Sequence, residues 1–336
     1  MSVSSAPMLR PVVVSALSHL HPGAGRSPGV VDLPVVRDPL GFFYVPGSGL
    51  KGALKSSLAL RYGCVDGKGD KVDCGLDADT NKCRDGKEKC CPLLCCLLGG
   101  EVGEGPEAPS RLSLGDLYPL LVPVPSLSHG LVYATSPYLV SAASQVVEAA
   151  GDAGKPLAPL LETLREAAGR LQERGKPVLV AEEEAAGELY LGLTRLQAGD
   201  LEVLGKGLDT ETLKLLQEVN PAYSMLSPAG RLLVVSDTWL LTLAERALVR
   251  LTRVRLDRSK KTVATRALWT EEYIPRLTLF TGYVADTRHT GKYCEKAGGV
   301  EDAVQELVDM MGGPRAVLVL GGKETVGKGL AALRVL

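Results

Sequence analysis

The chain has 336 residues, of which 45% are hydrophobic and 23% are charged, and its formal net charge at pH 7 is −1. These values are typical of a soluble globular protein with one large or two ordinary domains, and they exclude a protein that coats nucleic acid through an overall positive charge. The sequence lacks a leader pattern and an apolar run long enough to cross a bilayer, so we expect a cytoplasmic protein that does not bind a membrane.

Strand-like and helix-like patterns follow one another irregularly along the chain. Residues 8–20 predict a buried first strand and 21–29 a loop rich in Gly and Pro. Residues 42–45 predict a short strand, and a tight turn at 46–49 leads into a helix that begins at about Leu50. Beyond residue 110 we expect strands or strand-like segments at 111–140, 188–197, 232–237, 251–283 and 316–336, and helices at 141–150, 157–174, 209–219, 238–250 and 299–313. Because the two kinds of element do not alternate strictly, the expected fold class is α+β.

The turn before the first predicted helix has the features of a phosphate-binding helix start. Ser48 is a suitable N-cap, which leaves the amides of Gly49, Leu50 and Lys51 unpaired at the positive end of the helix dipole. Lys55 follows Lys51 by one helical turn, so both ammonium groups lie on the same side. The sequence therefore predicts a site for an RNA phosphate; the alternative is an ordinary corner between a strand and a helix.

The segment GGKETVGKG, residues 321–329, nearly matches a nucleotide-binding P-loop. Gly329 stands where the P-loop has the Ser or Thr that holds magnesium, and only seven residues follow it. We therefore disfavour an NTPase. A glycine-rich hairpin tip that carries Lys323 and Lys328 can instead let an RNA backbone approach closely; the alternative is a solvated turn.

The densest positive run is RLTRVRLDRSKK, residues 250–261. A solvated strand edge explains such a run on its own. Together with the turn at 46–49 and the tail at 321–329, it favours a track for a phosphodiester chain. The side chains predicted to contact RNA in this run are Arg253, Arg255, Arg258, Lys260 and Lys261.

Two residues of the first loop are candidates for catalysis. Asp32 lies in a glycine-flanked loop near His21. A lone loop aspartate commonly caps a turn, but RNA cleavage requires only that a 2′-hydroxyl be activated, which a carboxylate with bound Mg²⁺ (or Mn²⁺) or an imidazole can do. Asp38 competes with Asp32, although its place before Pro39 favours a turn.

Seven of the eight cysteines lie between residues 64 and 96, inside an insertion at 63–110 that is rich in Gly, Asp and Lys. Clustered cysteines favour a Zn²⁺ site, for which the candidate ligands are Cys74, Cys83, Cys90 and Cys95. Disulfides are the alternative if the source is a hyperthermophile. Cysteines in the apolar run CCPLLCCLL can also be simple buried residues.

Several segments carry a family resemblance. VPGSGLKGALKSS (45–57) and GGKETVGKGL (321–330) resemble the helix start and the C-terminal glycine-rich loop of the RAMP superfamily of CRISPR RNA-binding proteins. Three more segments, at 29–38, 115–140 and 267–275, make the chain similar to the repeating backbone subunit of the type III-B effector, the Cmr complex. The cysteine-rich insertion departs from that pattern.

The resemblance implies a single RAMP domain over residues 1–336, with a ferredoxin-like (RRM-like) core and a thumb hairpin in the region 250–276. It also implies a filament of copies along the CRISPR RNA (crRNA), in which each thumb displaces a nucleotide at regular intervals. The expected partners are crRNA, target RNA, further copies of the chain and other Cmr subunits. The RRM aromatic signature for base stacking is absent, which agrees with binding of the backbone.

Carried over by position, Asp32 matches the aspartate of target-RNA cleavage, and His21 matches a histidine of the preceding loop. Ser48, Lys51 and Lys55 fall on the helix that holds the guide backbone. The implied activity is a metal-dependent endoribonuclease that leaves a 2′,3′-cyclic phosphate and a 5′-hydroxyl. The alternative is a structural crRNA-binding paralogue without nuclease activity.

Overall fold

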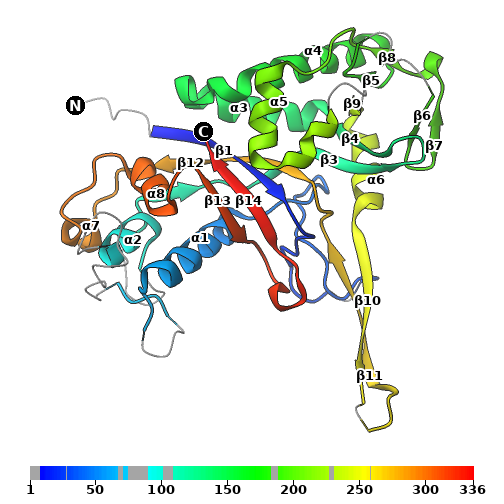
Figure 1. The fold of residues 1–336 in the computed structure, drawn as a ribbon. Helices are drawn as coiled ribbons and strands as arrows, with labels where there is room; N and C mark the ends of the chain where they lie inside the picture. Colours follow the sequence, from blue (N-terminus) through cyan, green and yellow to red (C-terminus); the bar gives the residue numbers. More distant parts are fainter. Residues whose placement is uncertain are drawn as a thin grey trace.

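A large mixed sheet organises the chain in the computed structural model, which describes residues 8–27, 29–66, 71–74, 90–100, 109–182, 188–226, 231–257 and 259–336. Within these residues, ten strands form one sheet in the order β13-β14-β1-β12-β3-β4-β9-β5-β8, with β2 paired to β12. Helices lie on both sides of it (Figure 1), and the predicted α+β class is confirmed. The strands of the sheet are β1 (Met8–Ala16), β2 (Leu112–Leu114), β3 (Tyr118–Ser126), β4 (Gly130–Thr135), β5 (Val178–Leu179), β8 (Glu202–Val203), β9 (Leu232–Val234), β12 (Leu279–Asp286), β13 (Arg315–Val319) and β14 (Leu330–Val335).

Strand β1 separates two hydrophobic cores. Successive side chains of a strand point to opposite faces, and Val12 and Val14 accordingly enter one core while Val13 enters the other. Burial on both faces explains why this strand is a nearly continuous apolar run. The first core includes residues of α1 (Gly47–Tyr62), α2 (Cys90–Leu98), α6 (Asp237–Ala247) and α8 (Ala303–Met311), and the second includes residues of α3 (Pro137–Ala150), α4 (Ala158–Arg174) and α5 (Thr210–Val219).

The remaining elements are short or lie outside the main sheet. Among them are α7 (Lys292–Lys296), the 3₁₀ turns η2 (Gly151–Leu157), η4 (Ala198–Asp200), η5 (Pro221–Leu226) and η6 (Glu324–Val326), and the strands β6 (Leu189–Leu191) and β7 (Thr194–Leu196). β6 and β7 form a hairpin, so the single strand predicted at 188–197 is wrong, because the chain reverses between Leu191 and Thr194. No helix in the described part of the chain is both long and apolar enough to span a bilayer.

Helix α1 begins at Gly47, three residues before the predicted start. Ser48 is therefore inside the helix, and its predicted role as N-cap is wrong: Pro46 precedes the helix, without a side-chain cap bond. A tertiary contact replaces the cap, because the Gly47 amide donates to Asp116 Oδ1 at 2.7 Å. A Cβ atom at Gly47 would lie 2.1 Å from the carbonyl oxygen of Leu114, so only glycine allows this approach.

A two-stranded antiparallel hairpin projects from the body of the molecule (Figure 1). It consists of β10 (Val249–Leu256) and β11 (Val263–Tyr273), and we call it the projecting hairpin. It coincides with the hairpin expected at 250–276. Its assignment as a thumb, like the ferredoxin-like core, stays a prediction.

Disulfides, in place of a zinc site, hold the described part of the cysteine-rich insertion. The bonds are Cys64–Cys91, Cys74–Cys95 and Cys96–Cys294. The zinc assignment is wrong for Cys74 and Cys95, because bonded sulfurs offer no thiolate to a metal. Cys83 and the side chain of Cys90 lie outside the described residues. Within those residues, no group of three or more His, Cys, Asp or Glu side chains could hold a metal ion.

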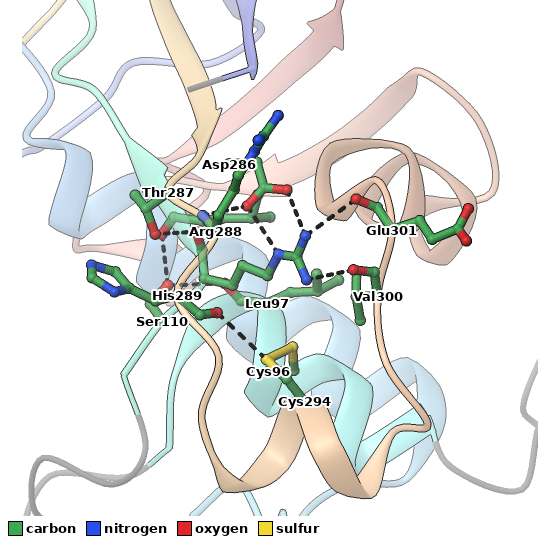
Figure 2. The surroundings of a disulfide bond; sticks show 12 residues. Cys96, Leu97, Ser110, Asp286, Thr287, Arg288, His289, Cys294, Val300 and Glu301 are labelled. Atoms are coloured by element: carbon green, nitrogen blue, oxygen red, sulfur yellow. Dashed lines mark hydrogen bonds and ion pairs between the residues drawn. A yellow bond between two sulfur atoms is a disulfide. The ribbon is translucent and has the colours of Figure 1, made fainter. Parts of the chain in front are cut away.

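The third disulfide joins α2 to α7 beside a buried ion pair (Figure 2). Arg111 donates to both carboxylate oxygens of Asp286 at 2.9 Å, and its remaining N–H groups reach the carbonyls of Val300 and Glu301. Burial alone would raise the pKa of Asp286, but the hydrogen bonds from Arg111 and from backbone amides outweigh it and lower that pKa. The Cys96–Cys294 disulfide thus attaches the insertion to a segment that also contributes Asp286 to the buried ion pair with Arg111.

Candidate nucleic-acid interface

The glycine-rich tail loop, residues 321–329, docks on the first loop of the chain through main-chain contacts. The Gly322 amide donates to the His21 carbonyl at 3.0 Å, and Gly321 bridges to His21. Gly321 has a φ of 80°, and a Cβ atom there would lie 2.5 Å from the His21 carbonyl oxygen. Glycine is required at this position both by the backbone conformation and by the close approach.

His21 connects the same loop to the projecting hairpin. Its side chain is buried, and Nδ1 lies 2.7 Å from the Glu272 carbonyl oxygen. Because a carbonyl only accepts, Nδ1 carries the proton and donates it. The imidazole also lies 5.5 Å from the ring of Tyr273. Through these contacts His21 links the first loop to the projecting hairpin. Its catalytic role stays a prediction.

A buried carboxylate, Glu271 of β11, gathers donors from three parts of the chain. It accepts from Lys323 Nζ at 2.6 Å, from Trp269 Nε1 at 2.8 Å and from Arg253 Nε at 3.2 Å, and Tyr273 also donates to it. Burial would raise its pKa, but the hydrogen bonds from Lys323, Tyr273 and Trp269 outweigh burial and lower it to about 2. Glu271 is therefore ionised and attaches the tail loop to the base of the projecting hairpin.

The next residue, Glu272, organises the other side of the strand. It is 1% exposed, and it contacts Arg37 at 2.9 Å, Arg250 at 3.1 Å and the Val35 amide at 3.2 Å. Sequence reasoning missed both glutamates. The available signal was two adjacent acidic residues within the strand-like segment ALWTEEYIP, because buried carboxylates require dedicated partners.

Asp32 faces a cavity formed by the first loop, the hairpin and the tail loop. Its Oδ2 atom accepts from the Thr270 amide at 2.7 Å, and Leu33 pairs with β11 through main-chain hydrogen bonds. The cavity has a volume of about 580 Å³ and is lined by Arg26, Ser27, Asp32, Leu33, Leu268, Trp269 and Lys323. A carboxylate and two cationic side chains thus surround a space large enough for part of an RNA strand.

The structure brings together two of the three predicted basic segments. Lys328 lies 5.2 Å from the ring centre of Tyr273, while Lys323 and Arg253 share Glu271. Further out on the projecting hairpin, Arg255, Lys260 and Lys261 are exposed, and Arg258 lies outside the described residues.

The start of α1 is held by a different set of contacts. Ser48 and Gly49 are exposed in its first turn, and Lys55 donates to the carbonyl of Gly100 at 3.0 Å. Burial, followed by the charge of Lys55, lowers the pKa of Lys51. Lys51 and Lys55 therefore form a second cationic position, apart from the contacts that surround Asp32.

The fold and the glycine-rich tail loop agree with one protein family. The sequence profile of the RAMP superfamily matches residues 13–332, and the chain belongs to this superfamily. It is 26% identical over 340 residues to the CRISPR system CMR subunit Cmr4 of Saccharolobus solfataricus, covering 97% of this chain and 96% of that protein. It is 29% identical over 314 residues to the CRISPR system Cmr endoribonuclease Cmr4 of Pyrococcus furiosus, covering 93% and 90%.

Solved structures share the fold. A chain in the cryo-EM structure of the type III-B Cmr-beta bound to cognate target RNA superposes with a TM-score of 0.66 at 24% identity, covering 97% of this chain and 96% of that one. The crystal structure of oligomeric Cmr4 from Pyrococcus furiosus gives a TM-score of 0.57 at 21% identity, with 98% of each chain covered. The resemblance stated from the sequence is confirmed.

Proposed function

We propose that the chain is a repeating backbone subunit of a type III-B CRISPR ribonucleoprotein in the cytoplasm. It binds crRNA along the phosphate backbone, assembles with further copies of itself and with other Cmr subunits, and cleaves complementary target RNA at regular intervals. The names of the two Cmr4 relatives support this assembly and this activity. The observation that carries the proposal is the position of Asp32 in a cavity that also presents the cations Arg26 and Lys323.

Asp32 is suited to activate a 2′-hydroxyl. The Thr270 amide fixes one of its carboxylate oxygens, which orients the second oxygen for the proton of an incoming hydroxyl. Attack of that 2′-oxygen on the adjacent phosphorus expels the 5′-oxygen and leaves a 2′,3′-cyclic phosphate and a 5′-hydroxyl. Cationic side chains at the same cavity stabilise the charge that develops on the phosphate.

A divalent metal fits this donor set only with RNA as a co-ligand. Of the described residues that line the cavity, Asp32 is the one carboxylate, and Glu271 already accepts hydrogen bonds from its own donors. Mg²⁺ is commonly held by one or two carboxylates together with substrate phosphates and water. Asp32 would hold the Mg²⁺ or Mn²⁺ of the proposed reaction, and the metal would supply Lewis-acid stabilisation of the phosphate.

The projecting hairpin supplies a second surface for RNA. Its outer part carries exposed Arg and Lys side chains, and two exposed apolar cross-strand pairs lie beside them: Val254 with Leu268, and Leu256 with Val263. Exposed apolar pairs are costly in water unless a partner covers them. This favours a hairpin that enters the guide–target duplex and separates neighbouring bases.

The test is target cleavage by the reconstituted complex with an Asp32→Asn subunit. We expect crRNA binding to persist and cleavage to fall by at least 100-fold. Asp38→Asn is a matched control, because the Asp38 carboxylate accepts from the amides of Leu40 and Phe42 in its own turn. Cleavage that survives Asp32→Asn but not Asp38→Asn would assign catalysis to Asp38. Cleavage that survives both would favour the alternative, a structural crRNA-binding paralogue whose complex cuts RNA elsewhere.

A further inference from the structure

We propose that Lys323 is the general acid of this reaction and protonates the 5′-oxygen as it leaves. The inference rests on the proposed function and assigns a catalytic role to a residue of the tail loop. Three observations support it: the residues that line the Asp32 cavity, the left-handed backbone conformation of Lys323, and the contact of its ammonium group with Glu271.

The residues around the cavity differ in their ability to give up a proton. Of the described residues that line it, only Lys323 and Arg26 are cationic. An arginine does not release its proton in proteins, whereas a lysine ammonium does. The hydroxyl of Ser27 is a weak acid, and His21 is not among the lining residues. Lys323 is therefore the lining side chain best able to give a proton to an alkoxide.

The backbone of the tail loop holds Lys323 firmly in place. Its φ is 71°, a left-handed conformation that is unfavourable for a residue with a side chain. Residues held in such conformations occur preferentially at functional sites, where the surrounding structure enforces them. The tail loop supplies that enforcement through its main-chain contacts with His21.

Glu271 anchors the ammonium group of Lys323. Nζ lies 2.6 Å from Glu271 Oε1, and the Lys323 side chain is 31% exposed while that of Glu271 is 3% exposed. One N–H of the ammonium is thus bound on the protein side, and others are free to point into the cavity. Glu271 fixes the position of Nζ, and the ammonium presents its other protons to a bound strand.

The proposed step balances without a further reactant. A bond forms between the 2′-oxygen and phosphorus as the bond from phosphorus to the 5′-oxygen breaks. The 2′-hydroxyl proton passes to Asp32, and a proton of the Lys323 ammonium passes to the 5′-oxygen. The neutral amine then regains a proton from solvent, and Asp32 loses its proton there.

The test uses reconstituted complexes that carry Lys323→Ala or Lys323→Arg, in single-turnover reactions at saturating target RNA. With an ordinary target, we expect both variants to be slowed by at least 100-fold. With a target that has sulfur in place of the 5′-bridging oxygen, the thiolate leaves without a proton, so both should recover to within about 10-fold of the wild type. The matched control is Lys206→Ala, because Lys206 Nζ also lies 2.6 Å from a glutamate, Glu166, but outside this cavity.

The outcomes separate this inference from the proposed function. Asp32→Asn should stay slow with the sulfur-containing target, because this variant is impaired in activating the 2′-hydroxyl and not in protonating the leaving group. If Lys323→Ala is equally slow with both targets, or only binds target more weakly, the acid role is refuted while nuclease activity stands. If the wild type cleaves neither target, the proposed function itself fails.

Discussion

Removing the disulfide between Cys96 and Cys294 should destabilise the protein more than removing either of the other two described bonds. It joins residues 198 apart in sequence, compared with 27 for Cys64–Cys91 and 21 for Cys74–Cys95. If a cross-link acts by restricting the unfolded chain, the longest loop corresponds to about 5 kcal/mol at 25 °C, and the shorter ones to about 3–4 kcal/mol. For a chain of this length, the unfolding entropy is about 0.7 kcal/mol/K, so 5 kcal/mol corresponds to about 7 °C in melting temperature.

The assay is calorimetric melting of C96A/C294A and C74A/C95A variants in oxidising buffer, repeated with a phosphine reductant. We expect the larger drop for C96A/C294A. In reductant, the melting temperature of the wild type should come close to those of both variants, because the wild type then lacks the same disulfides. Equal drops for the two variants, or a wild type that melts at the same temperature with and without reductant, would refute the argument from loop length.

Three further outcomes follow from contacts described above. The pKa of Glu271 in the folded protein is about 2, below its ordinary value of 4.5. Its ionised form therefore contributes stability above pH 4.5 that is lost as the pH falls toward 2. The melting temperature of the wild type should accordingly fall more steeply between pH 5 and 3 than that of Glu271→Gln. Gly321→Ala should lower the free energy of unfolding by about 1–3 kcal/mol and slow cleavage, because its Cβ meets the His21 carbonyl; an unchanged denaturant midpoint would contradict this. Asp286→Ala should cost about 3–5 kcal/mol in chemical denaturation by leaving Arg111 buried without its partner, and Arg111→Met in the same chain should restore part of it.

The sequence predicted best those helix ends that are set by a neighbouring capping residue or by a closing glycine. The helix expected at 209–219 is α5 at Thr210–Val219, because Asp209 caps it by accepting from the Thr212 amide. The helix expected at 299–313 is α8 at Ala303–Met311. Gly312 closes it near the expected end, but it begins at Ala303 rather than at residue 299, because Asp302 is its N-cap. The start of α1 was misplaced because a distant residue, Asp116, satisfies its first amide.

The candidate site was predicted only in part. Asp32 and the tail loop have recognisable sequence patterns. For Glu271 the sequence offers only a weak signal, two adjacent acidic residues in a strand-like segment, since its significance depends on donors from Lys323, Trp269 and Arg253 that the fold assembles. The cysteine chemistry was equally open. Clustered cysteines suit zinc and disulfides alike, and the partner of Cys96 is on α7, far along the chain.

The position of β1 has a consequence for synthesis of the protein. β1 hydrogen-bonds to β12 on one side and to β14 on the other, and both neighbours leave the ribosome long after β1 does. Until then, an apolar strand with two open edges is exposed to other nascent chains, which makes it a natural substrate for a chaperone. Lys323 lies between β13 and β14, so a growing chain cannot complete the cavity beside Asp32 until β13 has been translated.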